Sequence, residues 1–107
     1  MTLIQYRPVR ESEMAEVVEI FLVSVADMYE RHNIAQPAPP RPVVEKFYDH
    51  IRRTGIFQVA EVGGKLAAIC HAVVRDELWF LSGFWALPRS QGHGLGRTLL
   101  GRVWDEG

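Results

Sequence analysis

Apolar residues recur with helical spacing in three separate segments of the chain. In the first segment they fall at i, i+3, i+4, i+7, i+8, i+11, i+14 and i+15, which is the spacing of one helix face. We expect Ser12 to cap this helix, with Glu13 and Glu16 in its first turn, where the helix dipole favours negative charge. Pro42 suits the start of the second helix and Gly55 suits its end. The apolar residues of the three predicted helices are Met14, Val17, Val18, Phe21, Leu22, Val25, Met28 and Tyr29; then Val43, Val44, Phe47, Tyr48 and Ile51; and then Leu95, Leu99, Leu100, Val103 and Trp104.

Four other segments have the pattern of strands. Gly63-Gly64 predicts a tight hairpin turn between two of them, and Arg75-Asp76 predicts a second turn. The order of elements is strand, helix, helix, three antiparallel strands and helix, which indicates a mixed α/β (α+β) fold. No repeat or internal boundary divides residues 1–107, so we expect one domain. The predicted strands cover residues 2–6, 56–62, 65–74 and 77–87.

The last predicted strand contains a glycine, Gly83, between aromatic residues. An interior glycine weakens a strand unless it marks a bulge or a close approach of backbone. In the strand before it, Cys70 and His71 are neighbours, so we expect their side chains on opposite faces of the sheet. We assign neither residue a role.

The segment between the first two helices is rich in proline. Residues 33–42 hold four of the six prolines of the chain in their last six positions, so the segment is not expected to be helical. Its PxxP spacing is compatible with a ligand of an SH3-like domain. A stiff extended connector is the interpretation we favour.

Composition narrows the function only by exclusion. With 107 residues, 48% of them apolar and 23% charged, the chain has the composition of one folded domain. A net charge of −1 gives no reason to expect nucleic acid or a membrane surface as a partner. Cys70 is the single cysteine, so we expect neither a disulfide nor a metal site. The N-terminus has no apolar core of signal-peptide length, and we expect a cytoplasmic protein.

Three glycines alternate between the last strand and the third helix, at positions 92, 94 and 96. The first amides of a helix lack partners, and glycines in front of them can leave those amides open to a phosphate. Arg89 or Arg97 could add positive charge nearby. A Walker loop would need glycine where Gln91 stands, and a dinucleotide fingerprint would need it at Arg97 or Leu99. Glycines that merely allow close packing remain the alternative interpretation.

The stretch Gln91-Gly92-His93-Gly94-Leu95-Gly96 resembles the Q/R-x-x-G-x-G/A signature of the GCN5-related N-acetyltransferase (GNAT) superfamily. Pro88 stands three residues before it, after the aromatic strand LWFLSGFWALP, and a leucine-rich helix follows. The order of elements before the signature also matches that of the family. The resemblance covers the whole chain, which corresponds to the N-terminal two-thirds of such a domain.

This resemblance implies an N-acetyltransferase that uses acetyl-coenzyme A as cosubstrate and a primary amine as acceptor. The proline-rich loop and the second helix would wall the acceptor site, and Gly83 would be the bulge residue that opens the sheet edge. Backbone groups of Phe84, Trp85 and Ala86 would pair with the pantetheine arm. The pyrophosphate would lie on the amides of Gly92, His93, Gly94, Leu95, Gly96 and Arg97, with Gln91 at the entry of the loop.

The sequence also departs from the family pattern. A complete domain continues with further strands and a fourth helix, whose tyrosine often protonates the thiolate, whereas Tyr6, Tyr29 and Tyr48 all lie upstream. Glu77 is the only candidate base near the cleft, and we assign no catalytic residue. We therefore expect little or no turnover by this chain, with a homodimer or a missing C-terminal half completing the sheet. A non-catalytic module that binds acyl-coenzyme A or a protein partner is the alternative.

Overall fold

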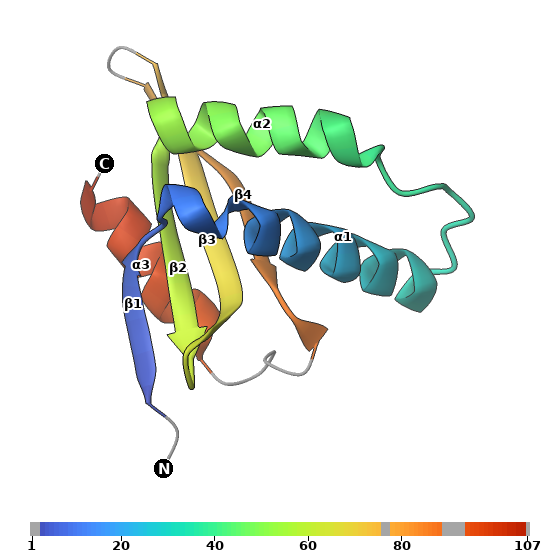
Figure 1. Ribbon diagram of the computed structural model, residues 1–107, viewed down its shortest axis with the longest axis horizontal. Coiled ribbons are helices and arrows are strands. Elements are labelled where there is room, and N and C mark those ends of the chain that lie inside the picture. Colours follow the sequence, from blue (N-terminus) through green and yellow to red (C-terminus); the bar gives the residue numbers. More distant parts are fainter. Residues whose placement is uncertain (1–2, 76–77, 89–93, 107) are drawn as a thin grey trace.

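The computed structural model describes residues 3–75, 78–88 and 94–106. It confirms the predicted order of elements and the α+β fold class (Figure 1). The four strands form one antiparallel sheet in the order β1-β2-β3-β4. The elements are β1 (Ile4–Pro8), a 3-10 turn (Glu11–Glu13), α1 (Met14–Arg31), α2 (Arg41–Thr54), β2 (Ile56–Val62), β3 (Lys65–Arg75), β4 (Leu78–Ala86) and α3 (Leu95–Glu106).

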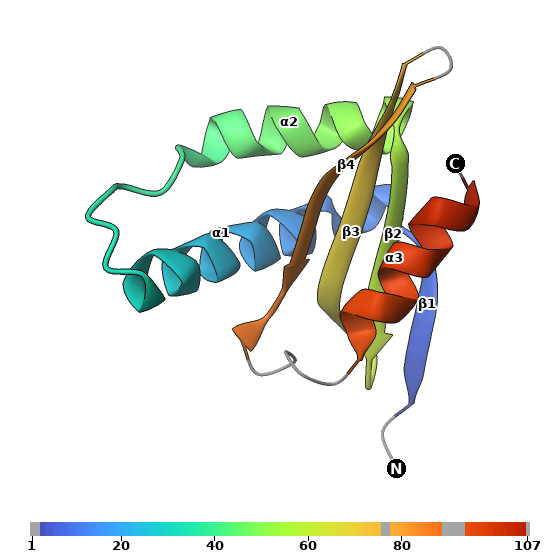
Figure 2. The ribbon, with the colours of Figure 1, turned by 180° about the vertical axis from the view of Figure 1, so that it is seen from behind.

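Helices cover both faces of the sheet. Helices α1 and α2 lie together on one face, and α3 lies on the other, as the two opposite views show (Figures 1 and 2). The core under α1 and α2 is built from large side chains such as Tyr48, Ile51 and Ile69. The core under α3 is built largely from alanines of β2 and β3, with Cys70 among them. Small side chains on the strands let α3 pack close to the sheet.

Neighbouring residues of β3 therefore point into different cores, as expected. Cys70 lies in the core under α3, whereas His71 contacts Tyr48 of α2 on the opposite face. Both side chains are buried. Burial raises the pKa of the Cys70 thiol to about 11, which leaves it a neutral packing group.

The glycine turns follow the predictions from sequence. Gly63 and Gly64 both have positive φ, 59° and 86°, which is the conformation of a tight hairpin turn. Gly55 ends α2, and a Cβ atom there would lie 2.4 Å from the carbonyl oxygen of Ala72. Glycine is needed at that position because β3 passes so close. The second predicted turn includes Asp76, which lies outside the described residues.

Two predictions at the N-terminus are wrong in detail. Strand β1 runs from Ile4 to Pro8 and so includes Pro8, which an edge strand tolerates. Ser12 does not cap α1, because it lies inside the 3-10 turn. Helix α1 begins directly after Glu13, and no side chain forms a capping hydrogen bond at its N-terminus. Glu13 instead accepts a hydrogen bond from the backbone N–H of Arg10 at 2.9 Å.

Glu13 also connects the start of α1 to the sheet, because it forms an ion pair with Arg7 of β1. Its two carboxylate oxygens accept bonds from Arg7 at 2.8 and 2.6 Å, and Glu61 of β2 accepts another at 2.8 Å. The bond from Arg7 holds the pKa of Glu13 below its ordinary value, and the two carboxylates raise the pKa of Arg7. The bidentate geometry fixes the approach of α1 to the sheet.

The proline-rich segment is the connector that we expected between α1 and α2. Residues 34–40 have no regular secondary structure, and α2 begins at Arg41, one residue before Pro42. Figure 1 shows this connector extending beyond the edge of the sheet that β4 forms. Within the described ranges, no helix is long and apolar enough to cross a bilayer.

Candidate functional site

A β-bulge interrupts β4 halfway along its length. His71 of β3 pairs with Gly83, but the next residue, Ala72, pairs with Leu81, so Ser82 is an extra residue. Ser82 and Gly83 consequently face the same side of the sheet, toward α2. The predicted bulge is confirmed, with Ser82 rather than Gly83 as the residue without a pairing partner.

Gly83 leaves the space that the imidazole of His71 occupies. A Cβ atom at position 83 would lie 2.6 Å from Cε1 and 2.8 Å from Nε2 of that ring. These distances are well below van der Waals contact, so any larger residue would displace the ring. The sequence predicted a close neighbour at this interior glycine, and that neighbour is the ring of His71, which explains why position 83 is glycine.

His71 is held at both ring nitrogens. Nδ1 lies 2.7 Å from Oγ of Ser82, and Nε2 lies 3.2 Å from the hydroxyl of Tyr48. The hydroxyl of Ser82 donates to the backbone carbonyl of His71 at 3.1 Å. Because that hydroxyl has one proton, Nδ1 donates to Ser82 and Nε2 accepts from Tyr48. Tyr48, His71 and Ser82 therefore satisfy one another's hydrogen-bonding groups.

Burial keeps this group neutral. The side chain of His71 is almost completely buried among aromatic rings of Phe47, Tyr48 and Phe57, and burial lowers its pKa to about 4. Burial likewise raises the pKa of Tyr48. At neutral pH both groups are uncharged, because no opposite charge compensates the loss of water.

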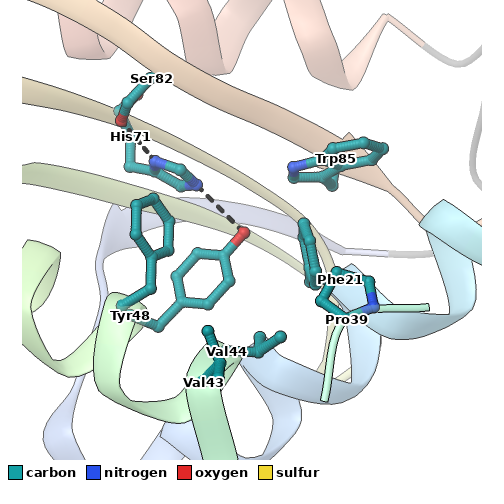
Figure 3. Close-up of a pocket in the computed structure, with 9 residues that line it drawn as sticks. Phe21, Pro39, Val43, Val44, Tyr48, His71, Ser82 and Trp85 are labelled. Atoms are coloured by element: carbon teal, nitrogen blue, oxygen red, sulfur yellow. Dashed lines mark hydrogen bonds between the residues drawn. The ribbon is translucent and has the colours of Figure 1, made fainter. Parts of the chain in front are cut away.

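A pocket of about 300 Å³ opens above this group, between α1, α2 and β4. We call it the α2 pocket. Figure 3 shows Phe21 and Trp85 across the pocket from Tyr48 and His71. Trp85 contacts Phe21 edge to face, with ring centroids 5.3 Å apart. The described residues that line the pocket are Phe21, Pro39, Val43, Val44, Phe47, Tyr48, His71, Ser82 and Trp85.

The second half of β4 is an edge in the part of the chain that the structure describes. Leu87 donates its N–H to the carbonyl of Ala67 at 2.9 Å, so in this register Trp85 also bonds toward β3. The backbone groups of Phe84 and Ala86 point to the outer side. The Ala86 carbonyl there accepts a bond from Ser24 of α1 at 3.1 Å.

Glycine is required at positions 94 and 96 for two different reasons. Gly94 has φ +76°, and a Cβ atom there would meet no heavy atom within 4 Å. Its backbone conformation is therefore what calls for glycine. A Cβ atom at Gly96 would lie 2.8 Å from Cζ of Phe84, so Gly96 is a close-packing glycine. The packing interpretation thus holds for one of the two glycines.

The start of α3 lies next to the outer part of β4 because of that packing. Leu95 is buried and anchors the first turn, whereas Gly94 and Arg97 are exposed. Arg97 also lines a surface groove with Leu81, Leu100, Gly101 and Trp104, which we call the edge groove. The structure thus brings the predicted residues of β4 and of the α3 start together. The other predicted residues, Arg89, Gln91, Gly92, His93 and Glu77, lie outside the described residues.

Sequence reasoning did not assign a role to the group formed by Tyr48, His71 and Ser82. These residues are 23 and 11 positions apart along the chain. The glycine at position 83 was the available signal, because an interior glycine predicts a close neighbour. The identity of that neighbour depends on the register of β3 and β4.

Comparison with known proteins identifies the family. A sequence model of the acetyltransferase (GNAT) family matches residues 22–106. Solved structures with a similar fold include ribosomal-protein-S18-alanine N-acetyltransferase from Escherichia coli, with TM-score 0.73 and 20% identity. They also include a GNAT-family acetyltransferase from Staphylococcus aureus Mu50 (0.75, 16%) and PaiA N-acetyltransferase from Thermoplasma acidophilum in complex with coenzyme A (0.75, 13%).

Each similarity covers 97% of this chain, but the chain spans only 59%, 66% and 71% of those three proteins. A search of curated proteins gives no significant match. Because the family match extends over most of the sequence, the chain belongs to the acetyltransferase (GNAT) family.

Proposed function

We propose that this chain binds acetyl-coenzyme A and belongs to an enzyme that transfers the acetyl group to a primary amine. The observation that carries the proposal is the contact between Gly96 and Phe84, which sets the glycine-led start of α3 beside the outer edge of a bulged strand. Family membership supports the same reaction. Among structural relatives, the Thermoplasma acidophilum enzyme was solved with coenzyme A.

The described residues fit such a cosubstrate. The first turn of α3 has amides without intrahelical partners, and Gly94 in front of it carries no side chain to shield them. The amides of Gly94, Leu95, Gly96 and Arg97, together with those of the predicted Gly92 and His93, would hold the pyrophosphate, with Gln91 at the entry of the loop. The outward backbone groups of Phe84 would bind the pantetheine arm as an added strand, whereas the outward carbonyl of Ala86 already accepts a bond from Ser24.

The chemistry divides between cosubstrate and protein. Acetyl-coenzyme A supplies an acetyl group activated as a thioester. The protein would hold the amine in line with that carbonyl, and an N–H on the outer edge of β4 would stabilise the developing oxyanion. The amine must be unprotonated when it attacks. We assign no catalytic base or acid, because the hydroxyl of Tyr48 already donates to His71.

We propose further that turnover by the 107-residue chain is weak. Among the described residues, β4 has a neighbouring strand on one side only, so one wall of a pantetheine channel is present. A second copy or a C-terminal half could supply the other wall. The reaction requires a compartment that contains acetyl-coenzyme A, and we propose the cytoplasm.

An acetyl-transfer assay with the purified chain tests the proposal. The chain is incubated with acetyl-coenzyme A and a panel of primary amines, and thiol release and acetylated product are measured together. We expect slow formation of both in equal amounts. Thiol release without acetylated amine would indicate hydrolysis and contradict the proposed transfer.

The alternative function is a non-catalytic module that binds acyl-coenzyme A or a protein partner. The observation that favours it is the internally satisfied group of Tyr48, His71 and Ser82, which leaves no polar side chain of that group free for proton transfer. Tight binding of acetyl-coenzyme A with no product from any amine would support this alternative. Absence of acetyl-coenzyme A binding would reject both the enzyme and the acyl-coenzyme A module, and would leave only a module that binds a protein partner.

A further inference from the structure

The α2 pocket has no charged group in its described lining. Seven of its nine lining residues are apolar or aromatic, and the other two are His71 and Ser82. His71 is neutral above about pH 4, because its buried ring has a lowered pKa. No carboxylate of the described lining could pair with a cationic group placed there.

The polar atoms beneath the pocket already have partners. Tyr48 donates to Nε2 of His71, and Nδ1 of His71 donates to Ser82, so none of these bonds awaits a ligand. Tyr48 and His71 are also almost completely buried. What the pocket offers to a ligand is therefore apolar surface.

That apolar surface is accessible and largely aromatic. Val43 and Phe47 of α2 are 60% and 43% exposed, although both are large apolar side chains. Phe47 packs edge to face on Tyr48, with ring centroids 5.1 Å apart, and Phe21 and Trp85 form another such pair. These ring edges and faces suit a further aromatic ring. A pocket volume of about 300 Å³ is at the small end for ligand sites and suits one compact group.

The position of Trp85 connects this pocket to the proposed cosubstrate edge. Its indole lines the pocket, while its neighbours Phe84 and Ala86 present backbone groups to the outer side of β4. A group held in the pocket beside Trp85 would therefore keep a short attached amine close to that edge.

We propose that the acceptor is an amine with one compact aromatic group, which occupies the α2 pocket, and with no second positive charge. This inference rests on the proposed function, because it names the acceptor of that reaction. A polyamine would place an ammonium group against apolar walls without a partner, which is unfavourable. An arylalkylamine would replace water against those walls with a ring.

Binding of three amines to the intact chain tests the inference. We compare 2-phenylethylamine, ethanolamine and 1,4-diaminobutane by NMR titration, each with and without coenzyme A. We expect 2-phenylethylamine to bind about tenfold or more tightly than the other two, given the apolar area that its ring buries. Its shifts should centre on Val43, Val44, Phe47 and Trp85. Equal or tighter binding of 1,4-diaminobutane, shifts elsewhere, or no amine binding would overturn the inference.

A matched pair of variants checks the site. Val43→Glu places a carboxylate at the pocket, at an exposed helix position that tolerates it, and should reduce the preference for 2-phenylethylamine over 1,4-diaminobutane about tenfold. Val23→Glu makes the same change at an exposed position of α1 outside the pocket lining and should leave the preference unchanged. An equal effect of both variants would contradict the pocket assignment.

The outcome also separates this inference from the proposed function. If acetyl-coenzyme A binds and 1,4-diaminobutane is acetylated as fast as 2-phenylethylamine, the acceptor class is wrong and the function stands. If 2-phenylethylamine fills the pocket but acetyl-coenzyme A does not bind, the function is wrong and the pocket's preference stands.

Discussion

Gly83 and His71 are matched residues of two paired strands: the missing side chain of one leaves room for the ring of the other. The nearest ring atom would lie 2.6 Å from a Cβ atom at position 83. The ring in turn links β3 to α2 through Tyr48 and to the bulge through Ser82. One glycine thus determines the packing beneath the α2 pocket.

Gly83→Ala should destabilise the protein by about 1–3 kcal/mol, because its methyl group forces the His71 ring from its place. Urea unfolding measures this loss. The same substitution at Gly101, where a Cβ atom meets nothing within 4 Å in α3, should stabilise by about 1 kcal/mol through helix propensity. A neutral Gly83→Ala would show that the ring has room to move.

The neutral state of His71 predicts how the free energy of unfolding depends on pH. The unfolded chain binds a proton at this side chain near pH 6.5, whereas the folded chain binds it only near pH 4. The free energy of unfolding should therefore fall as pH decreases through this window, by about 1.6 kcal/mol between pH 6.5 and 5. Above pH 7 the contribution is constant.

Urea unfolding at several pH values measures this slope, with His71→Gln as the variant that removes it. An NMR titration of the His71 ring in the unchanged protein provides an independent measurement. A ring that titrates near pH 6.5 in the folded protein would contradict the buried, neutral state.

The bidentate ion pair of Arg7 should contribute more to the free energy of unfolding than an exposed ion pair does. Arg7→Met leaves Glu13 and Glu61 without their shared partner and should cost about 2 kcal/mol, since these side chains are mostly buried. Arg41→Met removes an exposed pair with Glu19 and should cost less than about 0.5 kcal/mol. Chemical denaturation of both variants makes the comparison, and equal losses would contradict it.

The sequence pattern predicted correctly those elements that depend only on residues close together along the chain. The apolar stripe of α1 and the Gly63-Gly64 hairpin depend on neighbouring residues, and both predictions are confirmed. Ser12 was wrong as a cap because a 3-10 turn, stabilised by Glu13, precedes the helix. Single residues at helix ends depend on contacts that the apolar pattern does not encode.

The candidate site was predictable where a motif marks it. Gly94 and the start of α3 follow from the signature, and Gly83 follows from its place inside a strand. The partner of Gly83 could not be read from the sequence, because the bulge shifts the register between β3 and β4 by one residue. The α2 pocket likewise depends on how α2 packs across the sheet.

The edge groove predicts association through the outer side of β4. Leu81, Leu100 and Trp104 are large apolar side chains that remain exposed there. We expect the mean mass in light scattering to rise with protein concentration, because pairing would cover these exposed apolar side chains. Leu81→Lys should reduce this rise, whereas Leu3→Lys, an equally drastic change outside the edge groove, should not. A constant monomer mass would reject self-association.

Calorimetric titration of the chain with acetyl-coenzyme A tests the central claim most directly. Gly94→Ala should weaken binding about tenfold or more, because alanine disfavours φ +76° and would move the amides at the start of α3. Gly101→Ala, two turns further along the same helix, is the control and should bind as the unchanged chain does. We predict saturable binding that is weakened only in Gly94→Ala; absence of binding, or equal binding by both variants, would contradict the assignment of this loop to the cosubstrate.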